Sequence, residues 1–285
     1  MIRLVASDMD GTLLNSGGKV SSLNIAAIEA LRRKNIGFVV CTGRNYEDAR
    51  SPLEEAGISC DIICMNGAAV FDSRGNRIRK QSLLNSQVSS ILDICRPFPV
   101  LYDFMAEDGS YTISSRDEFK KSFEEKIFLS MVSEEHTFET IAERFRFTTE
   151  EKLLGSDIDI YKISIVHENP EILNQIRCHL EREEGISVAS SAPSNLELTH
   201  IRAQKGSALM EYAVNAKIRP KEILAIGDSE NDRSMLELPL GYTIAMGNAS
   251  EMIKRSARLM TRSNNEDGVA VAVEALILSD TAAAY

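Results

Sequence analysis

The chain contains 285 residues, and its 42 acidic against 32 basic side chains give a formal net charge of -10 at pH 7. This acidic balance argues against a general nucleic-acid binder or an anionic-membrane binder, because both need a basic face to meet phosphates. The length corresponds to one large domain or two ordinary ones, and 44% hydrophobic with 26% charged residues excludes global disorder.

The N-terminal segment, MIRLVASDMDGTLLN, places carboxylates where a signal peptide needs an apolar stretch. No apolar run in the sequence approaches the roughly 20 residues of a membrane-spanning helix. The five cysteines are odd in number and include no CxxC pair, so neither a disulfide framework nor a thiolate zinc site is indicated. We therefore expect a cytoplasmic protein with no membrane partner.

Apolar strands and amphipathic helices alternate in the first third of the chain. Apolar runs lie at 2–7, 36–41 and 61–65, and helix-like stretches at 23–34 and 45–56 separate them. Continuous apolar runs divided by helices indicate βαβ units, with a parallel sheet that is buried on both faces.

The middle of the chain has a different pattern. Between about 83 and 193, alternating strand-like segments mix with helical stretches, which is typical of an α+β insert. Beyond it, strands are predicted at 222–229 and 241–248, and helices at 206–216 and 266–278. We therefore predict an α/β fold in which a Rossmann-like parallel sheet, built from both ends of the chain, is interrupted by a separate α+β domain.

Acidic residues follow the first strand, in the sequence Asp8-Met9-Asp10-Gly11-Thr12. Two carboxylates spaced i, i+2 point to the same side if the strand geometry persists. Ligands of open α/β sheets bind beyond the carboxyl ends of the strands, so these carboxylates are candidates for a ligand-binding site. Asp and Gly are also ordinary turn residues, and this motif alone does not decide between the two interpretations.

Other strand ends carry similar chemistry. Thr42 and Gly43 follow the second strand and offer a hydroxyl and a backbone N–H, although Thr-Gly is also common in turns. The strand near 222–226 ends in Gly227-Asp228-Ser229-Glu230-Asn231-Asp232. Lys205 precedes a predicted helix, where an ammonium would meet an anion bound near the helix N-terminus. Taken singly, Lys205 could equally be a solvated surface lysine.

The combination of these motifs predicts a metal-assisted phosphate site. The carboxylates expected at one sheet edge are Asp8, Asp10, Asp228 and Asp232. Carboxylates so close cannot all stay ionised without a cation, and Mg²⁺ is the ion that typically lies between carboxylates and a substrate phosphate. The donors expected for that phosphate are Thr42, Gly43, Lys205 and Asn231. One carboxylate is then available as a nucleophile and its neighbour for acid/base chemistry.

This set of motifs, in this order, resembles the haloacid dehalogenase-like hydrolase superfamily, and within it the Cof-type (IIB) phosphatases. The matching segments are Asp8-Met9-Asp10-Gly11-Thr12-Leu13-Leu14, Thr42-Gly43-Arg44, Lys205-Gly206 and Gly227-Asp228-Ser229-Glu230-Asn231-Asp232. Two further segments, Asn66-Gly67-Ala68 and Asn265-Glu266-Asp267-Gly268-Val269-Ala270, also look like stretches of the family. One departure is Gln204, where many relatives have an acidic residue before the lysine.

The resemblance implies a role for each matching residue. Asp8 is implied as the nucleophile that forms an aspartyl-phosphate, and Asp10 as the acid that protonates the leaving alcohol and then activates water. The residues implied to hold the phosphate are Thr42, Lys205, Asn231 and the backbone of Met9 and Gly43. The implied Mg²⁺ ligands are Asp8, the backbone carbonyl of Asp10, and Asp228, with Asp232 as a further ligand or as support.

The resemblance also implies a division of the chain into a catalytic core, 1–82 and 193–285, and an inserted cap, 83–192, that sets specificity. The expected function is Mg²⁺-dependent hydrolysis of phosphomonoesters of small metabolites, either sugar phosphates or cofactor- and nucleotide-like phosphates, by a monomer or homodimer. A phosphotransferase or phosphomutase on the same site is an open alternative. A non-enzymatic, phosphorylatable receiver module is disfavoured by Asp10 and by the domain-sized insert. A dinucleotide-binding dehydrogenase is disfavoured because no GxGxxG follows the first strand.

Overall fold

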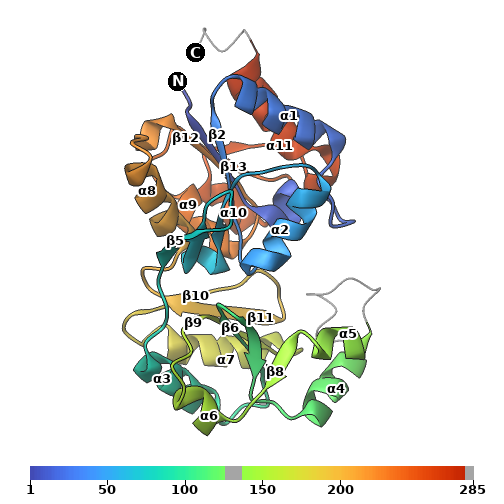
Figure 1. Cartoon of the computed structure of the whole chain (residues 1–285), viewed down its shortest axis with the longest axis vertical. Helices are drawn as coiled ribbons and strands as arrows, with labels where there is room; N and C mark the ends of the chain where they lie inside the picture. Colours follow the sequence, from blue (N-terminus) through green and yellow to red (C-terminus); the bar gives the residue numbers. More distant parts are fainter. Residues whose placement is uncertain (126–136, 280–285) are drawn as a thin grey trace. The chain divides into compact units, whose positions relative to one another are not determined.

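The structure is a computed structural model that describes residues 1–125 and 137–279 (Figure 1). It consists of two compact units. We call the first the core unit, formed by residues 1–80 and the chain from 204 onward, and the second the inserted unit, residues 81–203. None of the helices in the described part of the chain has the length and apolar character to cross a membrane.

The core unit is built on an eight-stranded sheet in the order β14-β13-β12-β1-β2-β3-β4-β5. Its strands are β1 (Leu4–Ser7), β2 (Gly37–Cys41), β3 (Asp61–Cys64), β4 (Ala69–Phe71), β5 (Arg77–Lys80), β12 (Ile223–Gly227), β13 (Tyr242–Ala245) and β14 (Leu259–Met260). The strands from β14 to β3 pair in parallel, whereas β4 and β5 are antiparallel additions at one edge. The predicted α/β fold with a parallel core is therefore confirmed.

Helices pack against this sheet because their apolar residues recur on one face. The helices are α1 (Ser22–Arg33), α2 (Tyr46–Glu55), α8 (Lys205–Asn215), α9 (Arg233–Leu236), α10 (Glu251–Ser256) and α11 (Gly268–Val273). In α1, Ser21 caps the N-terminus by accepting from the backbone N–H of Asn24, and Ile28 and Leu31 are buried. Leu209 of α8 and Leu236 of α9 belong to the buried cluster that includes strand residues of the sheet. Helices α1 and α11 lie together, away from α8 (Figure 1).

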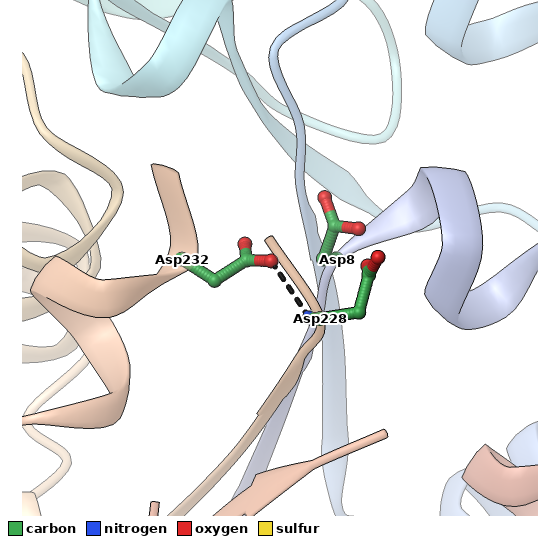
Figure 2. Close-up of side chains that lie close together, drawn as sticks. All are labelled: Asp8, Asp228 and Asp232. Carbon is green, nitrogen blue, oxygen red and sulfur yellow. Dashed lines mark hydrogen bonds between the residues drawn. The ribbon is translucent and has the colours of Figure 1, made fainter. Parts of the chain in front are cut away.

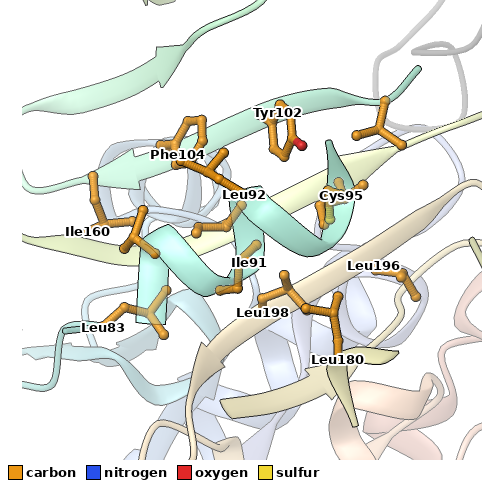
Figure 3. Packing of buried hydrophobic residues seen from close by; sticks show 14 of the residues in the cluster. Leu83, Ile91, Leu92, Cys95, Tyr102, Phe104, Ile160, Leu180, Leu196 and Leu198 are labelled. Atoms are coloured by element: carbon orange, nitrogen blue, oxygen red, sulfur yellow. The ribbon is translucent and has the colours of Figure 1, made fainter. Parts of the chain in front are cut away.

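The inserted unit is built on a six-stranded sheet in the order β10-β11-β9-β6-β7-β8, in which only the β7–β8 pair is parallel among the described strands. The strands are β6 (Leu101–Ala106), β7 (Gly109–Thr112), β8 (Phe145–Phe147), β9 (Ile160–Val166), β10 (Ile186–Ala189) and β11 (Asn195–His200). The helices are α3 (Asn85–Cys95), α4 (Arg116–Glu124), α5 (Phe138–Ala142), α6 (Glu150–Leu154) and α7 (Pro170–Leu180). Ile91 and Leu92 of α3 pack with Leu198 of β11 in one apolar cluster (Figure 3).

The second crossing between the units lies later in the chain than the expected boundary at 192/193. Strand β11 pairs on one side with β10 and on the other with β9, so its backbone hydrogen bonds tie it to the inserted unit. The chain returns to the core unit only after Ala203, directly before Lys205 at the start of α8. The inserted unit thus ends just before the predicted site motif Lys205-Gly206.

Candidate active site

Asp8 and Asp228 leave neighbouring parallel strands at the same edge of the core sheet. Strands β1 and β12 are paired in register, with Ser7 opposite Ile226, and the Asp8 backbone N–H donates to the Ile226 carbonyl at 2.9 Å. One carboxylate oxygen each from Asp8, Asp228 and Asp232 lies within 4.8 Å of the others (Figure 2). The structure therefore brings together three of the four carboxylates that the sequence motifs single out.

Lys205 lies directly against this cluster. Its Nζ is 2.6 Å from Asp8 Oδ1 and 2.7 Å from Asp232 Oδ1, and its side chain is completely buried. Burial lowers the pKa of the Lys205 ammonium, but the two carboxylates outweigh it and raise the pKa above its ordinary value. Lys205 is thus a buried, permanently charged group of the site and not a surface lysine.

Asp232 holds the loop that follows β12. Its Oδ2 accepts a hydrogen bond from the backbone N–H of Asp228 at 2.9 Å (Figure 2). The same oxygen accepts from the backbone N–H of Ser229 at 2.9 Å, and Oδ1 accepts from Lys205. Gly227 makes this approach possible, because a Cβ there would lie 2.5 Å from the Asp232 carboxyl carbon. Both Asp232 oxygens are engaged by protein donors, which is the pattern of a residue that supports the site.

The close approach at Gly227 leads to a stability prediction. We expect Gly227→Ala to lower the free energy of unfolding by about 1–3 kcal/mol, because the added methyl must displace the buried Asp232 carboxylate or bend β12. Urea unfolding followed by circular dichroism measures the change. Gly17→Ala is the matched control, since Gly17 is exposed and its Cβ would meet only the side-chain oxygen of Asn15, at 3.2 Å. Equal unfolding midpoints for the two variants would contradict the prediction.

The charges of the cluster do not balance within the protein. Burial raises the pKa of Asp8 well above its usual range, Asp232 raises it further, and Lys205 lowers it only in part. Burial also raises the pKa of Asp228 to about 6, although hydroxyls donate to its oxygens from Thr12 at 2.7 Å and Ser229 at 3.0 Å. The three carboxylates are thus accompanied by one ammonium, which contacts Asp8 and Asp232. An all-oxygen donor set with excess negative charge fits a hard divalent cation such as Mg²⁺.

Asp10 differs from the expectation that its carboxylate joins the others. The chain leaves strand geometry directly after Asp8 and enters the tight turn Met9–Leu13, where Gly11 has φ of +74°. The i, i+2 alternation of a strand therefore does not apply, and the Asp10 carboxylate pairs instead with the guanidinium of Arg44. Its side chain is 57% exposed, in contrast to the buried Asp8.

The expected phosphate donors lie on loops at the same edge. Thr42 directly follows β2, which pairs with β1, and it is completely buried. Gly43 comes next in the same loop, and Met9 occupies the turn after Asp8. Asn231 lies in the short helical turn Glu230–Asp232, and its Nδ2 donates to Asn66 Oδ1 at 3.2 Å. These placements put the expected donors on the strand-end loops of the core unit.

Several asparagines that support the site carry no role in the sequence analysis. Asn66 has φ of +56°, and its backbone N–H donates to the Thr42 carbonyl at 3.0 Å. Three side-chain amides donate to carbonyls of the loop that begins at Met9: Asn248 to Gly11, Asn24 to Leu13 and Asn264 to Leu14. Of these residues, only Asn66 lies within a family-like segment of the sequence, and Asn264 directly precedes the other such segment.

Comparisons with known proteins agree with this geometry. A family model described as haloacid dehalogenase-like hydrolase matches residues 5–273. Phosphatase YwpJ of Bacillus subtilis (strain 168) is 33% identical over 279 residues, covering 94% of this chain and 98% of that protein. The 5-amino-6-(5-phospho-D-ribitylamino)uracil phosphatase YcsE of the same organism is 27% identical over 279 residues, covering 97% and 96%. A solved haloacid dehalogenase-like hydrolase structure from B. subtilis matches with a TM-score of 0.84 at 32% identity, covering 97% of this chain and 100% of that one.

Proposed function

The chain belongs to the haloacid dehalogenase-like hydrolases, and from this premise we propose that it is a Mg²⁺-dependent phosphatase that hydrolyses phosphomonoesters of small metabolites. The observation that carries the proposal is the placement of Asp8. Its carboxylate is buried at the end of β1, lies 2.6 Å from the Lys205 ammonium, and shares the sheet edge with Asp228 and Asp232. An anionic phosphate ester and a cation together would complete this arrangement of charges.

The proposed reaction has two steps. In the first, an Asp8 carboxylate oxygen attacks phosphorus in line with the leaving oxygen, the ester bond breaks, and Asp10 gives its proton to the departing alcohol. In the second, Asp10 takes a proton from water, which attacks the aspartyl-phosphate and releases inorganic phosphate and free Asp8. Lys205 stabilises charge on the phosphoryl oxygens in both steps. Thr42 and Asn231, with the backbone of Met9 and Gly43, are proposed to orient the phosphate.

The proposed metal ligands are Asp8, Asp228 and the backbone carbonyl of Asp10. Asp232 is proposed to act as support, because both of its oxygens already accept hydrogen bonds from the protein. The ion supplies positive charge beside the phosphoryl oxygens when bound. Its charge would also counteract the burial and the carboxylate repulsion that together raise the pKa of Asp8 and of Asp228.

Metal removal tests this ligand set. We expect enzyme dialysed against a chelator to lose about 100-fold or more of its activity toward an aryl phosphate, because the metal charge at the phosphoryl oxygens is lost. Adding Mg²⁺ should restore activity, and it should also raise the unfolding temperature, since an ion that binds only the folded state stabilises it. Full activity in chelator would overturn the metal assignment. Asp228→Asn should weaken the thermal shift by Mg²⁺, whereas Asp93→Asn, an exposed change in the inserted unit, should not.

The substrate is proposed to be a small phosphorylated metabolite, and the inserted unit to be a cap that sets specificity. The relative named as a 5-amino-6-(5-phospho-D-ribitylamino)uracil phosphatase supports a substrate of the sugar-phosphate or nucleotide-like kind. A panel of phosphorylated metabolites, assayed for inorganic phosphate with Mg²⁺ present, tests the class. Parallel assays for phosphoryl transfer to an added alcohol distinguish hydrolysis from a phosphotransferase reaction.

A further inference from the structure

We propose that Arg44 is the positioning residue for Asp10, holding the carboxylate of the acid/base group in place for the two-step reaction. The inference rests on the proposed function but assigns a role to a residue that the proposed reaction leaves without one. It is carried by the two-point contact between these side chains and by the way the rest of each residue is fixed.

The contact between the two side chains is bidentate. Arg44 Nη2 lies 2.6 Å from Asp10 Oδ1 and Arg44 Nε lies 2.8 Å from Asp10 Oδ2. Two parallel hydrogen bonds between planar groups fix distance, direction and rotation together, which a single contact cannot do. The guanidinium therefore determines the orientation of the Asp10 carboxylate as well as its position.

Arg44 is itself held on three sides. Its Nη1 donates to the carbonyl of Asp48 in α2 at 3.0 Å, and its backbone N–H donates to Thr42 Oγ1 at 3.1 Å. Its carbonyl accepts from the backbone N–H of Met65 at 2.9 Å. Arg44 thus has a fixed place in the loop after β2, which also carries Thr42, and its side chain connects that loop to Asp10.

On the other side of the contact, the backbone of the Asp10 turn is fixed and only the side chain is left to be placed. The Gly11 carbonyl accepts from Asn248 Nδ2 at 2.8 Å, and a Cβ at Gly11 would lie 2.5 Å from Asp228 Oδ2. The Asp10 side chain, by contrast, is 57% exposed. With solvent on one side, a carboxylate samples several rotamers unless a partner selects one.

Stability alone does not explain this pair. The Arg44 and Asp10 side chains are 32% and 57% exposed. Solvent screens an ion pair that is this exposed, so the pair contributes little to folding stability. Catalysis is far more sensitive to position, since a shift of about 1 Å in a reacting group can cost about 100-fold in rate. The contact therefore matters more for where Asp10 lies than for whether the protein folds.

A double-mutant cycle tests the proposal. The variants are Arg44→Gln, Asp10→Asn and the double variant, assayed with a dinitrophenyl phosphate at saturation with Mg²⁺ present. This leaving group needs no protonation, so slow turnover reports hydrolysis of the aspartyl-phosphate, the step in which Asp10 acts as base. We expect Arg44→Gln to lower kcat about 10- to 100-fold and to raise the fraction of phosphoenzyme seen by mass spectrometry after acid quench. In the Asp10→Asn background the same change should lower kcat by less than about twofold.

The controls separate positioning from loss of charge or of structure. Arg50→Gln removes a guanidinium from the same helix region, where Arg50 pairs with Glu47 and Glu54 and lies over the ring of Tyr46. This change should leave kcat unchanged. Arg44→Lys keeps the positive charge but cannot form the bidentate contact of a guanidinium. Its kcat should lie between those of wild type and Arg44→Gln. If circular dichroism shows Arg44→Gln to be unfolded, the same cycle is run with Arg44→Lys.

Three results would overturn the inference: equal fold losses with and without Asp10, no loss at all, or a gain in kcat. Equal losses in kcat would mean that Arg44 acts on the phosphate directly. A gain in kcat would mean that the contact with Arg44 keeps Asp10 out of its catalytic position. Failure of the proposed function has a different signature, because wild-type enzyme would then form no phosphoenzyme and Asp8→Asn would stay active.

Discussion

Asp8→Asn is expected to lower kcat for an aryl phosphate by about 10⁴-fold or more, because an amide cannot replace the carboxylate as the nucleophile toward phosphorus. The side chain keeps its size, so the loss is not one of packing. The protein should remain folded, since removing one of the clustered carboxylates relieves repulsion while Asp232 keeps its contact with Lys205. Turnover, acid-quench mass spectrometry for phosphoenzyme, and the unfolding temperature together measure these effects.

The matched control for Asp8→Asn is Asp93→Asn, the same chemical change on an exposed side chain of α3. It should leave turnover and phosphoenzyme formation as in wild type. An Asp8→Asn protein that still hydrolyses the ester, or that still gains a phosphoryl group, would exclude Asp8 as the nucleophile. A protein that loses activity together with its circular-dichroism signal would instead show that Asp8 is needed for folding, and Asp8→Glu would then be compared.

The parallel part of the core sheet is predictable because its strands are continuous apolar runs. All four residues of β1 are buried, and the last three residues of both β2 and β3 are buried, so no alternation is needed to recognise them. The antiparallel edge was missed for the opposite reason. Strand β5, Arg77–Lys80, is short, mostly charged and largely exposed, and it exists through its pairing with β4. Its sequence therefore looks like a loop.

The candidate site divides in the same way. Asp8, Asp228 and Lys205 could be located from sequence, because strand ends and a helix start determine where they lie. The direction of Asp10 could not, since it depends on a turn in which Gly11 takes a left-handed conformation. The amide contact from Asn248 to Gly11 joins residues 237 positions apart in the chain, and sequence spacing carries no information about it.

Lys205→Met is the second change with a large expected effect, and it should act on both rate and stability. The rate should fall about 10²- to 10³-fold, because the ammonium no longer stabilises charge on the phosphoryl oxygens. Stability in chelator should fall by about 3–5 kcal/mol, because Asp8 and Asp232 lose the ammonium that pairs with both of them and stay buried. Lys19→Met, the same change at an exposed loop position, should lower neither the rate nor the stability.

The pH dependence of that loss distinguishes an electrostatic cause from a packing cause. A carboxyl whose pKa is raised on folding favours the neutral form in the folded state, so its contribution is present at low pH and is lost as pH rises through the raised value. Burial already raises the pKa of Asp228 to about 6, and removing the ammonium can only strengthen the repulsion that Asp8 feels. Lys205→Met in chelator should therefore lose stability relative to wild type as the pH rises from about 5 to about 8. Mg²⁺ should restore part of the lost stability at the higher pH, where the carboxylates are ionised. A stability difference that is the same at both pH values and insensitive to Mg²⁺ would show that Lys205 acts through packing alone.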